Sequence, residues 1–437
     1  MQMRLWCEYA WLGGPEVTPG VLIDIDGGMI VSAAAAPPAA DAVTLRGVTL
    51  PGLANAHSHA FQRVLRGRSQ RRRGSFWSWR EAMYAAAAEL TPDSYRELAR
   101  ATFAEMALAG ITLVGEFHYV HHGPDGAPYA DPNAMGAAVA EAAAEAGVRM
   151  TLLDTCYLHG GVGAELSGTQ RRFGDRTVDA WASRVDELSD GQLLRIGAAA
   201  HSVRALTPDE LTAVANWARW RAMPLHAHVS EQPRENDDCV AAYGRSPVEV
   251  LEDAGCLATQ FTAVHATHLL EGDAQRLGRA AVTCCLCPTT ERDLADGVGK
   301  ASALAGAGTW LALGSDSNGV IDLFEEARAM ELDERLWSGE RVLHDPAQLL
   351  GAATARGYAA LGWDGGALRP GAPADLVRVS LDSVRLAGTP PEDLVAGLVF
   401  AAHPADVEDV MVGGRWIVRD GGHVDIDAAA ELEHALR

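Results

Sequence analysis

The stretch VTLPGLANAHSH (48–59) is an apolar run that ends in two histidines, His57 and His59, with a single residue between them. Alternate residues on a β-strand point to the same side, so both imidazoles can face one cavity while the small Ser58 points away. Two imidazoles at this spacing can form half of a metal site. An isolated pair of this kind is also compatible with two ordinary histidines, so its meaning depends on the rest of the chain.

Seven further strand-like runs follow this stretch, and they alternate with segments rich in Ala, Leu and Glu. The segments between the runs, such as 92–110 and 131–147, have the apolar spacing of helices that pack one face inward. Eight strands alternating with helices predict an α/β fold, a (β/α)₈ TIM-like barrel. The seven later runs cover residues 111–120, 149–159, 194–203, 224–231, 261–269, 280–288 and 309–318.

Both ends of the chain have a different pattern. They consist of short strand-like runs separated by turn residues, including the hairpin-like stretch DVMVGGRWIVRDGGHV (409–424). Chain termini often lie close together. We therefore expect residues 1–49 and 370–437 to form one small β-sandwich domain, and residues 50–369 to form the catalytic barrel.

The chain of 437 residues is 48% hydrophobic and has a formal net charge of −22. Nucleic acids and anionic membranes require a broad cationic surface, so neither is expected as a partner. The one basic run, 66–74, is interpreted as a solvated loop. No run approaches the roughly 20 apolar residues of a membrane span. Seven cysteines in a long chain do not suggest a secreted disulfide framework, and the cytoplasm is the expected location.

Polar residues of the kinds that bind metals gather near the carboxyl ends of the predicted strands. In a (β/α)₈ barrel these ends form one rim, where catalytic groups from different strands meet. His57, His59, His228 and Asp316 supply three nitrogens and one carboxylate, a set that suits one divalent ion, with Zn²⁺ favoured and Fe²⁺ or Mn²⁺ as alternatives. The other members of the rim are Glu116, His118, His201, Glu231, His265 and His268.

A water molecule bound to such a metal loses a proton near neutral pH and can attack as hydroxide. Glu231, three residues after His228, is placed to take that proton and pass it to a leaving nitrogen. The alternative for Glu231 is a salt bridge on the following loop. His265 can orient the nucleophile or stabilise the developing charge, and His268 is interpreted as structural.

Two further clusters are also interpreted as structural. The cysteines of TCCLCP resemble a thiolate metal site only superficially, because neighbouring residues on a strand face opposite ways and no second CxxC exists. We expect buried packing for Cys284, Cys285 and Cys287. The histidines of GEFHYVHH are likewise interpreted as structural; they are His118, His121 and His122.

Four motifs at the predicted strand ends resemble the amidohydrolase superfamily, and the resemblance extends over nearly the full chain. The motifs are PGLANAHSHAFQR, HAHVSEQ, VHATH and LALGSDS, and GALRPGAPADLV leads back into the terminal strands. The resemblance implies a (β/α)₈ barrel, a β-sandwich built from both termini and metal-dependent hydrolysis at the barrel mouth. Many members hold two metals bridged by a lysine after the fourth strand. Here that strand reads IGAAAHSVRA (196–205), so the resemblance favours the one-metal deaminase branch and leaves a bridging Glu or Cys open.

Longer stretches are similar to the formimidoylglutamate deiminases of histidine degradation: HSHAFQR, SFWSWREAMY, GEFHYVHH, YADP, HSVRALTP and HVSEQPRENDDC. This resemblance implies hydrolysis of N-formimino-L-glutamate to N-formyl-L-glutamate and ammonia, by a homodimer. The implied metal ligands are His57, His59, His228 and Asp316. Catalysis is implied for Glu231, His265 and Asp316, and substrate binding for Gln62, Arg80, Tyr119, His201 and Arg204.

The chemistry of this small dicarboxylate partner suits these residues. Lys300 is the only lysine in the chain, so arginine must supply nearly all cationic contacts. Arg80 and Arg204 can each hold one carboxylate through two hydrogen bonds, while Glu231 and Asp316 match the cationic amidinium. Replacing Arg204 is expected mostly to weaken binding, whereas replacing Glu231 is expected to lower kcat.

Two rival functions remain at this stage. One is another one-metal deaminase that acts on a purine, pyrimidine or guanidine compound, whose pocket would favour aromatic stacking and amide contacts over two arginines. The other is a catalytically silent barrel that serves as a scaffold. The retention of four proposed ligands together with Glu231 argues against the scaffold.

Overall fold

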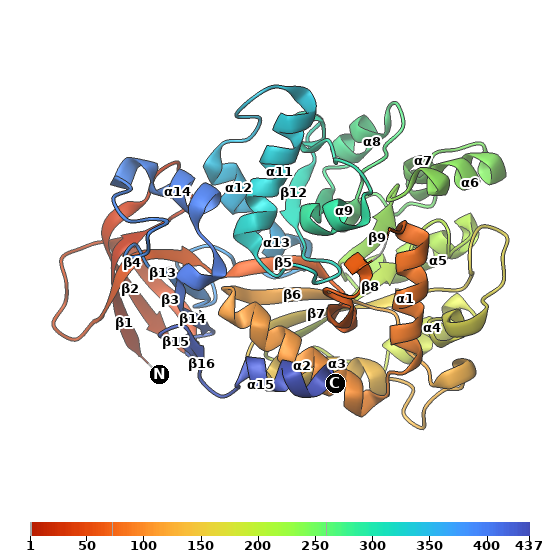
Figure 1. Cartoon of the computed structure of the whole chain (residues 1–437), viewed down its shortest axis with the longest axis horizontal. Coiled ribbons are helices and arrows are strands. Elements are labelled where there is room, and N and C mark those ends of the chain that lie inside the picture. Colours follow the sequence, from red (N-terminus) through yellow and green to blue (C-terminus); the bar gives the residue numbers. More distant parts are fainter. Residues whose placement is uncertain (1, 72, 259) are drawn as a thin grey trace.

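The computed structural model describes residues 2–71, 73–258 and 260–437, and within them the chain forms two eight-stranded sheets. One sheet is parallel and follows the chain order from β5 to β12. A bridge between Ser58 and Asp316 joins its first strand to the turn after its last, so the sheet closes into a (β/α)₈ barrel (Figure 1). All eight predicted strands are confirmed: β5 (Leu53–Ser58), β6 (Ile111–His118), β7 (Arg149–Cys156), β8 (Leu194–Ala200), β9 (Leu225–Val229), β10 (Phe261–His265), β11 (Thr283–Leu286) and β12 (Trp310–Leu313).

Helices surround the barrel, and several begin at a strong sequence signal. A Ser, Thr or Asp cap followed by proline precedes α2, α5, α7 and α12, and in each the cap and the third helical residue form a capping box. None of the described helices has both the length and the apolar character needed to cross a bilayer. The helices are α1 (Phe76–Ala88), α2 (Pro92–Leu108), α3 (Ala134–Glu145), α4 (Val178–Val185), α5 (Pro208–Trp220), α6 (Pro233–Tyr243), α7 (Pro247–Asp253), α8 (Asp273–Arg279), α9 (Pro288–Leu294), α10 (Ala301–Gly306), α11 (Leu323–Ser338), α12 (Pro346–Ala352), α13 (Ala355–Ala360), α14 (Leu394–Ala401) and α15 (Ala428–Ala435).

The run 48–59 is divided between the two sheets rather than forming one strand. Its first residues belong to β4 (Val43–Pro51), and the barrel strand starts at Leu53. Gly52 lies between them, where its N–H donates to the carbonyl oxygen of Asp375 across 2.9 Å. A Cβ at this position would lie 2.0 Å from Oγ1 of Thr112, so only glycine fits where the chain passes from one sheet to the other.

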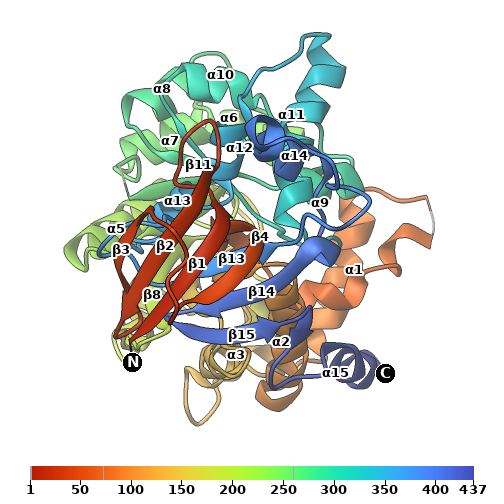
Figure 2. The same cartoon turned by 90° about the vertical axis from the view of Figure 1, so that its left-hand side faces the viewer.

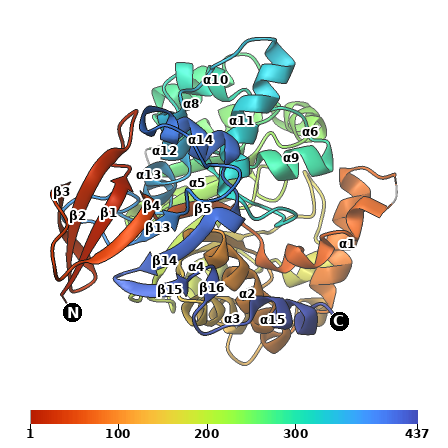
Figure 3. The same ribbon diagram turned by 60° about the vertical axis from the view of Figure 1, so that its left-hand side comes forward.

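The second sheet combines strands from both ends of the chain, as the sequence predicts. Its order is β16-β15-β14-β13-β4-β1-β2-β3, and it forms a sandwich-like domain at one side of the barrel (Figures 2 and 3). Leu5, Ile23, Leu45, Leu376 and Met411 are buried in its core. The strands are β1 (Met3–Ala10), β2 (Thr18–Asp26), β3 (Met29–Ala35), β13 (Leu376–Val379), β14 (Val407–Val412), β15 (Arg415–Arg419) and β16 (Gly422–His423).

The C-terminal helix α15 leaves this sheet and packs beside α2 of the barrel (Figure 1). Arg100 on α2 pairs with Glu431 on α15. Arg68, in the loop before α1, donates from Nη2 to the carbonyl oxygen of Leu436 across 2.9 Å. The end of the chain is therefore tied to the barrel at two points.

Candidate active site

The four predicted metal ligands meet at the carboxyl ends of the barrel strands, and all four are buried. Nε2 of His57 lies 3.3 Å from Nε2 of His228 and 3.3 Å from Oδ1 of Asp316. Nε2 of His59 lies 3.4 Å from the same carboxylate oxygen. Side chains from β5, β9 and the turn after β12 thus converge on one point.

Hydrogen bonds to the backbone fix the tautomers of two of these histidines. Nδ1 of His59 donates to the carbonyl oxygen of Phe117 across 2.9 Å, and Nδ1 of His228 donates to that of His201 across 3.1 Å. Each Nε2 therefore carries a lone pair. Burial lowers the pKa of His57 and His228, and it lowers the pKa of His59 to about 3, so these imidazoles are neutral.

This donor set fits one divalent cation. Nε2 of His57 lies 3.3 Å from Nε2 of His228 and from Oδ1 of Asp316, and its Nδ1 is buried without a hydrogen-bond partner among the described residues, so nitrogen and oxygen donors crowd one point that a cation would stabilise. Imidazole nitrogen and carboxylate oxygen are the ligands that Zn²⁺ prefers when cysteine is absent from the set. The residues that would hold the ion are His57, His59, His228 and Asp316.

The turn that carries Asp316 is shaped by the neighbouring strand. The N–H of Asp316 donates to the carbonyl oxygen of His57 across 3.0 Å, and the N–H of His59 donates to that of Asp316 across 2.9 Å. Nδ2 of Asn318 donates to the carbonyl oxygen of His59 across 3.0 Å. Asp316 and Asn318 have φ angles of 45° and 57°, which are strained for residues other than glycine. The closure of the barrel therefore also places the carboxylate of the metal site.

Glu231, just beyond β9, is paired with Arg204 beyond β8. Nη2 of Arg204 donates to Oε2 of Glu231 across 2.9 Å, and its Nε lies 3.2 Å from Oε2 of Glu235. Burial lowers the pKa of Arg204, but the charges of Glu235 and Glu231 more than offset this effect and raise it. From the sequence, Arg204 is expected to bind a substrate carboxylate. The structure adds that two protein carboxylates already contact its guanidinium.

His265, at the end of β10, lies between two glutamates. Its Nε2 is 3.9 Å from Oε1 of Glu231, and its Nδ1 is 3.4 Å from Oε1 of Glu291 on α9. Burial lowers the pKa of His265, but the hydrogen bond with Glu291 and the charges of Glu231 and Asp316 raise it to about 10. The imidazole is therefore protonated at neutral pH. Glu291 was not anticipated from the sequence.

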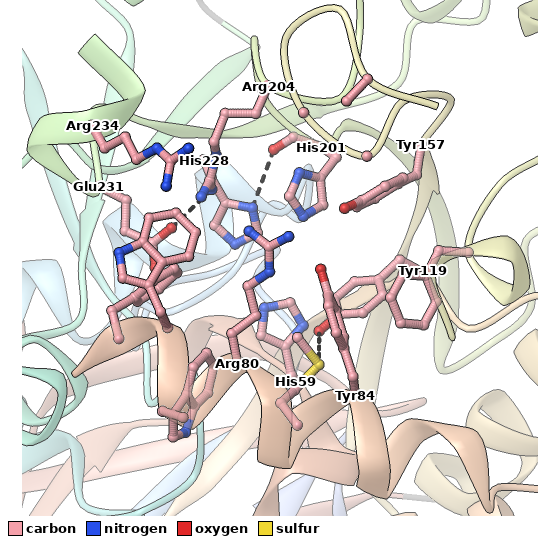
Figure 4. A pocket seen from close by; sticks show the side chains of 18 of the residues that line it. His59, Arg80, Tyr84, Tyr119, Tyr157, His201, Arg204, His228, Glu231 and Arg234 are labelled. Carbon is pink, nitrogen blue, oxygen red and sulfur yellow. Dashed lines mark hydrogen bonds and ion pairs between the residues drawn. The ribbon is translucent and has the colours of Figure 1, made fainter. Parts of the chain in front are cut away.

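A cavity of about 440 Å³ opens beside these groups and reaches His59, His228, Glu231 and Asp316. Figure 4 shows the labelled side chains that point into it. All five predicted substrate-binding residues line it as well: Gln62, Arg80, Tyr119, His201 and Arg204. The structure thus brings the predicted residues together, while their individual roles stay predictions.

Hydrogen bonds and aromatic contacts order the far wall of the cavity. Nε2 of Gln62 donates to the hydroxyl of Tyr119 across 3.0 Å. The guanidinium carbon of Arg80 lies 5.2 Å from the ring centre of Trp77 and 5.1 Å from that of Tyr84. Trp77, Arg80 and Tyr84 are spaced three and four residues apart on α1, so they share one face of the helix. This spacing is visible in the sequence, yet only Arg80 was predicted to belong to the site. Other lining residues missed from the sequence are Tyr157, Arg234 and Asp238.

The two clusters interpreted as structural do not line this cavity. Asp154, which lies near His118 and His121, accepts hydrogen bonds of 2.8 Å from both Nη1 and Nη2 of Arg184, so a guanidinium already compensates its charge. The neighbouring cysteines of β11 point to opposite sides of the sheet, as expected. Cys284 packs in the core that includes the barrel helices. Cys285, and Cys287 just after the strand, are also buried and face the barrel interior.

Comparisons with known proteins identify the family of the chain. The sequence model of the amidohydrolase family matches residues 48–417. Formimidoylglutamate deiminase of Pseudomonas aeruginosa is 37% identical over 399 residues, which cover 88% of each chain. The crystal structure of an amidohydrolase from Brucella melitensis superposes with a TM-score of 0.92 at 35% identity, covering 100% of this chain and 99% of that one. An adenosine deaminase from Xanthomonas campestris, solved with bound zinc, superposes with a TM-score of 0.84 at 26% identity over 99% of this chain and 96% of that one. The family model, the relative and the solved structures agree, and the chain belongs to the amidohydrolase family.

Proposed function

We propose that this amidohydrolase is a metal-dependent deiminase that converts N-formimino-L-glutamate and water into N-formyl-L-glutamate and ammonia. The observation that carries the proposal is Arg80. Its guanidinium lines the cavity that reaches the candidate metal ligands, and among the described residues it contacts the rings of Trp77 and Tyr84 rather than a carboxylate. A cation in that position suits a substrate carboxylate held away from the reacting carbon. The similarity to the Pseudomonas aeruginosa deiminase supports the same substrate.

A divalent ion held by His57, His59, His228 and Asp316 would lower the pKa of a bound water and so supply a nucleophile at neutral pH. Arg204 holds Oε2 of Glu231 at 2.9 Å, which leaves Oε1 as the oxygen that accepts a proton. Glu231 then donates that proton to the leaving nitrogen, so ammonia departs as a neutral molecule, and the second proton of the water leaves the new formyl oxygen for solvent.

His265 and Asp316 support the same reaction in different ways. The protonated imidazole of His265 stabilises negative charge that develops on the oxygen bonded to the reacting carbon, and Glu291 fixes its orientation from the other side at 3.4 Å. The carboxylate of Asp316 matches the cationic amidinium of the substrate. Gln62, Tyr119 and His201 provide neutral hydrogen-bonding groups along the cavity.

The aromatic wall of the cavity favours a second candidate, the deamination of a purine or nucleoside. Trp77, Tyr84, Tyr119 and Tyr157 line the space and could stack on a planar ring. Adenosine deamination is the activity named for the Xanthomonas campestris neighbour. Against this candidate, a purine has no carboxylate to occupy Arg80.

An ammonia-release assay decides between the two. The purified enzyme, with its metal content measured, is given N-formimino-L-glutamate, N-formimino-L-aspartate, guanine and adenosine in parallel. We expect kcat/KM for N-formimino-L-glutamate to exceed that for each other compound by about 100-fold. Turnover of guanine or adenosine without turnover of the formimino compounds would refute the proposal.

A further inference from the structure

Arg234, the second residue of α6, also faces the cavity and has no role in the proposed reaction. Its guanidinium carbon lies 5.0 Å from the ring centre of Trp77, the same ring that Arg80 approaches to 5.2 Å. One indole on α1 is therefore contacted by a guanidinium from its own helix and by another from α6. Figure 4 shows the guanidinium groups of Arg80, Arg204 and Arg234 reaching the same space from different elements.

The three arginines differ in how far their charge is already compensated. Arg204 contacts two carboxylates at 2.9 and 3.2 Å. Arg234 has one carboxylate partner among the described residues, Asp238, at 3.4 Å, and both side chains are about half exposed or more, at 66% and 48%. Exposed pairs of this kind contribute little and are screened by solvent. The cavity therefore has two guanidinium groups whose charge is largely uncompensated by carboxylates among the described residues: Arg80 inside it and Arg234 at its solvent side.

A dicarboxylate that approaches this chain meets an unfavourable field at long range, because the formal net charge is −22. Local cations at the mouth of a cleft can reverse that effect and raise the association rate of an anionic substrate. A residue that acts in this way changes kcat/KM, and salt screens its influence beyond a Debye length of about 8–10 Å at moderate ionic strength.

We infer that Arg234 is a specificity-determining residue, which together with Arg80 and the shared ring of Trp77 forms an outer anion subsite that admits substrates carrying carboxylates. The inference rests on the proposed function, because it takes the substrate to be a dicarboxylate. Arg234 does not take part in the chemical step. Its contribution lies in attraction and first contact, before the reacting carbon reaches the metal ligands.

The test compares three variants of the metal-loaded enzyme at low and high salt. Arg234→Gln should lower kcat/KM for N-formimino-L-glutamate by about 5- to 20-fold at low ionic strength, while kcat stays within about twofold of the wild-type value. Most of this loss should disappear in 0.5 M salt, where the Debye length is roughly 4 Å. Asp238→Asn removes the competing carboxylate and should raise kcat/KM by about two- to fivefold. Arg279→Gln on α8 changes the net charge equally, outside the cavity, and should change kcat/KM by less than about twofold.

A purely structural role for Arg234 predicts different results. If Arg234 only stabilises the position of α1 by packing on Trp77, the loss of kcat/KM in Arg234→Gln would persist in 0.5 M salt. In that case Trp77→Phe would reproduce the loss. If it acts through charge, Arg234→Lys keeps most of the activity. Calorimetric titration with glutarate measures the same subsite without turnover, and the affinity of Arg234→Gln should fall in parallel.

The outcomes separate this inference from the proposed function. A wild-type enzyme that neither releases ammonia from N-formimino-L-glutamate nor binds glutarate overturns both. Wild-type turnover with an unchanged kcat/KM in Arg234→Gln overturns only the role of Arg234.

Discussion

Arg204 donates from Nη2 to Oε2 of Glu231 across 2.9 Å, and this contact joins a predicted substrate-binding residue to the predicted proton carrier. The same guanidinium reaches Glu235 at 3.2 Å. One buried cation thus balances two carboxylates beside the metal ligands. A substrate carboxylate that also binds Arg204 would share it with these groups, so binding and proton transfer are coupled through a single side chain.

Arg204→Gln should therefore lower kcat as well as raise KM, which differs from the effect on binding alone expected from the sequence. Without the guanidinium, two neighbouring buried carboxylates lose their cation, and one of them will retain a proton to higher pH. We expect kcat/KM to fall by about 100-fold or more, with the acidic limb of the kcat profile moved to higher pH. Steady-state kinetics from pH 5 to 9 measure both effects. An unchanged kcat would show that Arg204 serves binding only.

Glu231→Gln tests the proton-transfer role directly. The amide keeps the shape of the side chain and can still contact Arg204, but it cannot accept and return a proton. We expect kcat to fall by about 10²- to 10⁴-fold while the metal content stays the same. Glu271→Gln, an exposed change of the same kind, serves as the matched control. Near-normal turnover in Glu231→Gln with metal bound would remove Glu231 from the chemical step.

Gly314→Ala should disturb the metal site from outside the ligand set. A Cβ there would lie 2.7 Å from Cβ of His57, 2.8 Å from its carbonyl oxygen and 3.0 Å from Sγ of Cys287. His57 must shift, and we expect metal affinity to fall about 10- to 100-fold. Metal titration of the chelator-treated protein measures this loss. Gly306→Ala in α10, where nothing lies within 4 Å, is the control and should bind metal normally.

His226 gives a prediction about stability and pH. Burial lowers the pKa of this imidazole from the 6.5 of an unperturbed histidine to about 4. Because the folded-state pKa is depressed, the folded chain binds fewer protons than the unfolded chain between these values. The associated stability is present above pH 6.5 and is lost as the pH falls toward 4, by up to about 1.4 kcal/mol per pH unit.

Urea unfolding of the metal-loaded protein at several pH values between 4.5 and 7.5 measures this slope. His226→Gln keeps a donor for the carbonyl oxygen of Ala360, which Nε2 of His226 contacts at 2.9 Å. The variant should lose stability less steeply than the wild type as the pH falls. Parallel curves for the two proteins would mean that His226 is not protonated in the unfolding transition.

The barrel and the convergence of the four candidate metal ligands were predictable from the sequence because both depend on local pattern. Each strand is a short apolar run, and parallel strands in a closed sheet bring their carboxyl ends to one rim. His57, His228 and Asp316 were identified in this way, although they are far apart in the chain. The domain boundary was expected at 49/50, within the run 48–59, but its exact position at Gly52 was not predicted, since it depends on the close approach of Thr112 from another strand.

Contacts across the barrel mouth could not be predicted in the same way. The placement of Glu291 against His265, and of Arg234 against Trp77, depends on how α9, α6 and α1 pack over the strand ends. Such packing brings together residues from separate elements, and no regular spacing in the sequence indicates which of them will be in contact. The local pattern predicted only some of the α1 residues that line the cavity. Arg80 was identified, but Trp77 and Tyr84 on the same helical face were not.

The contacts of α15 have a consequence for how the molecule tolerates change at its C-terminal end. Glu431 and the carbonyl of Leu436 attach this helix to α2 and to the loop that leads into α1. Truncation of α15, or a bulky fusion at its end, would therefore loosen the loop before α1, the helix that lines the mouth of the cavity. The terminal sheet that precedes α15 in the chain would be affected less.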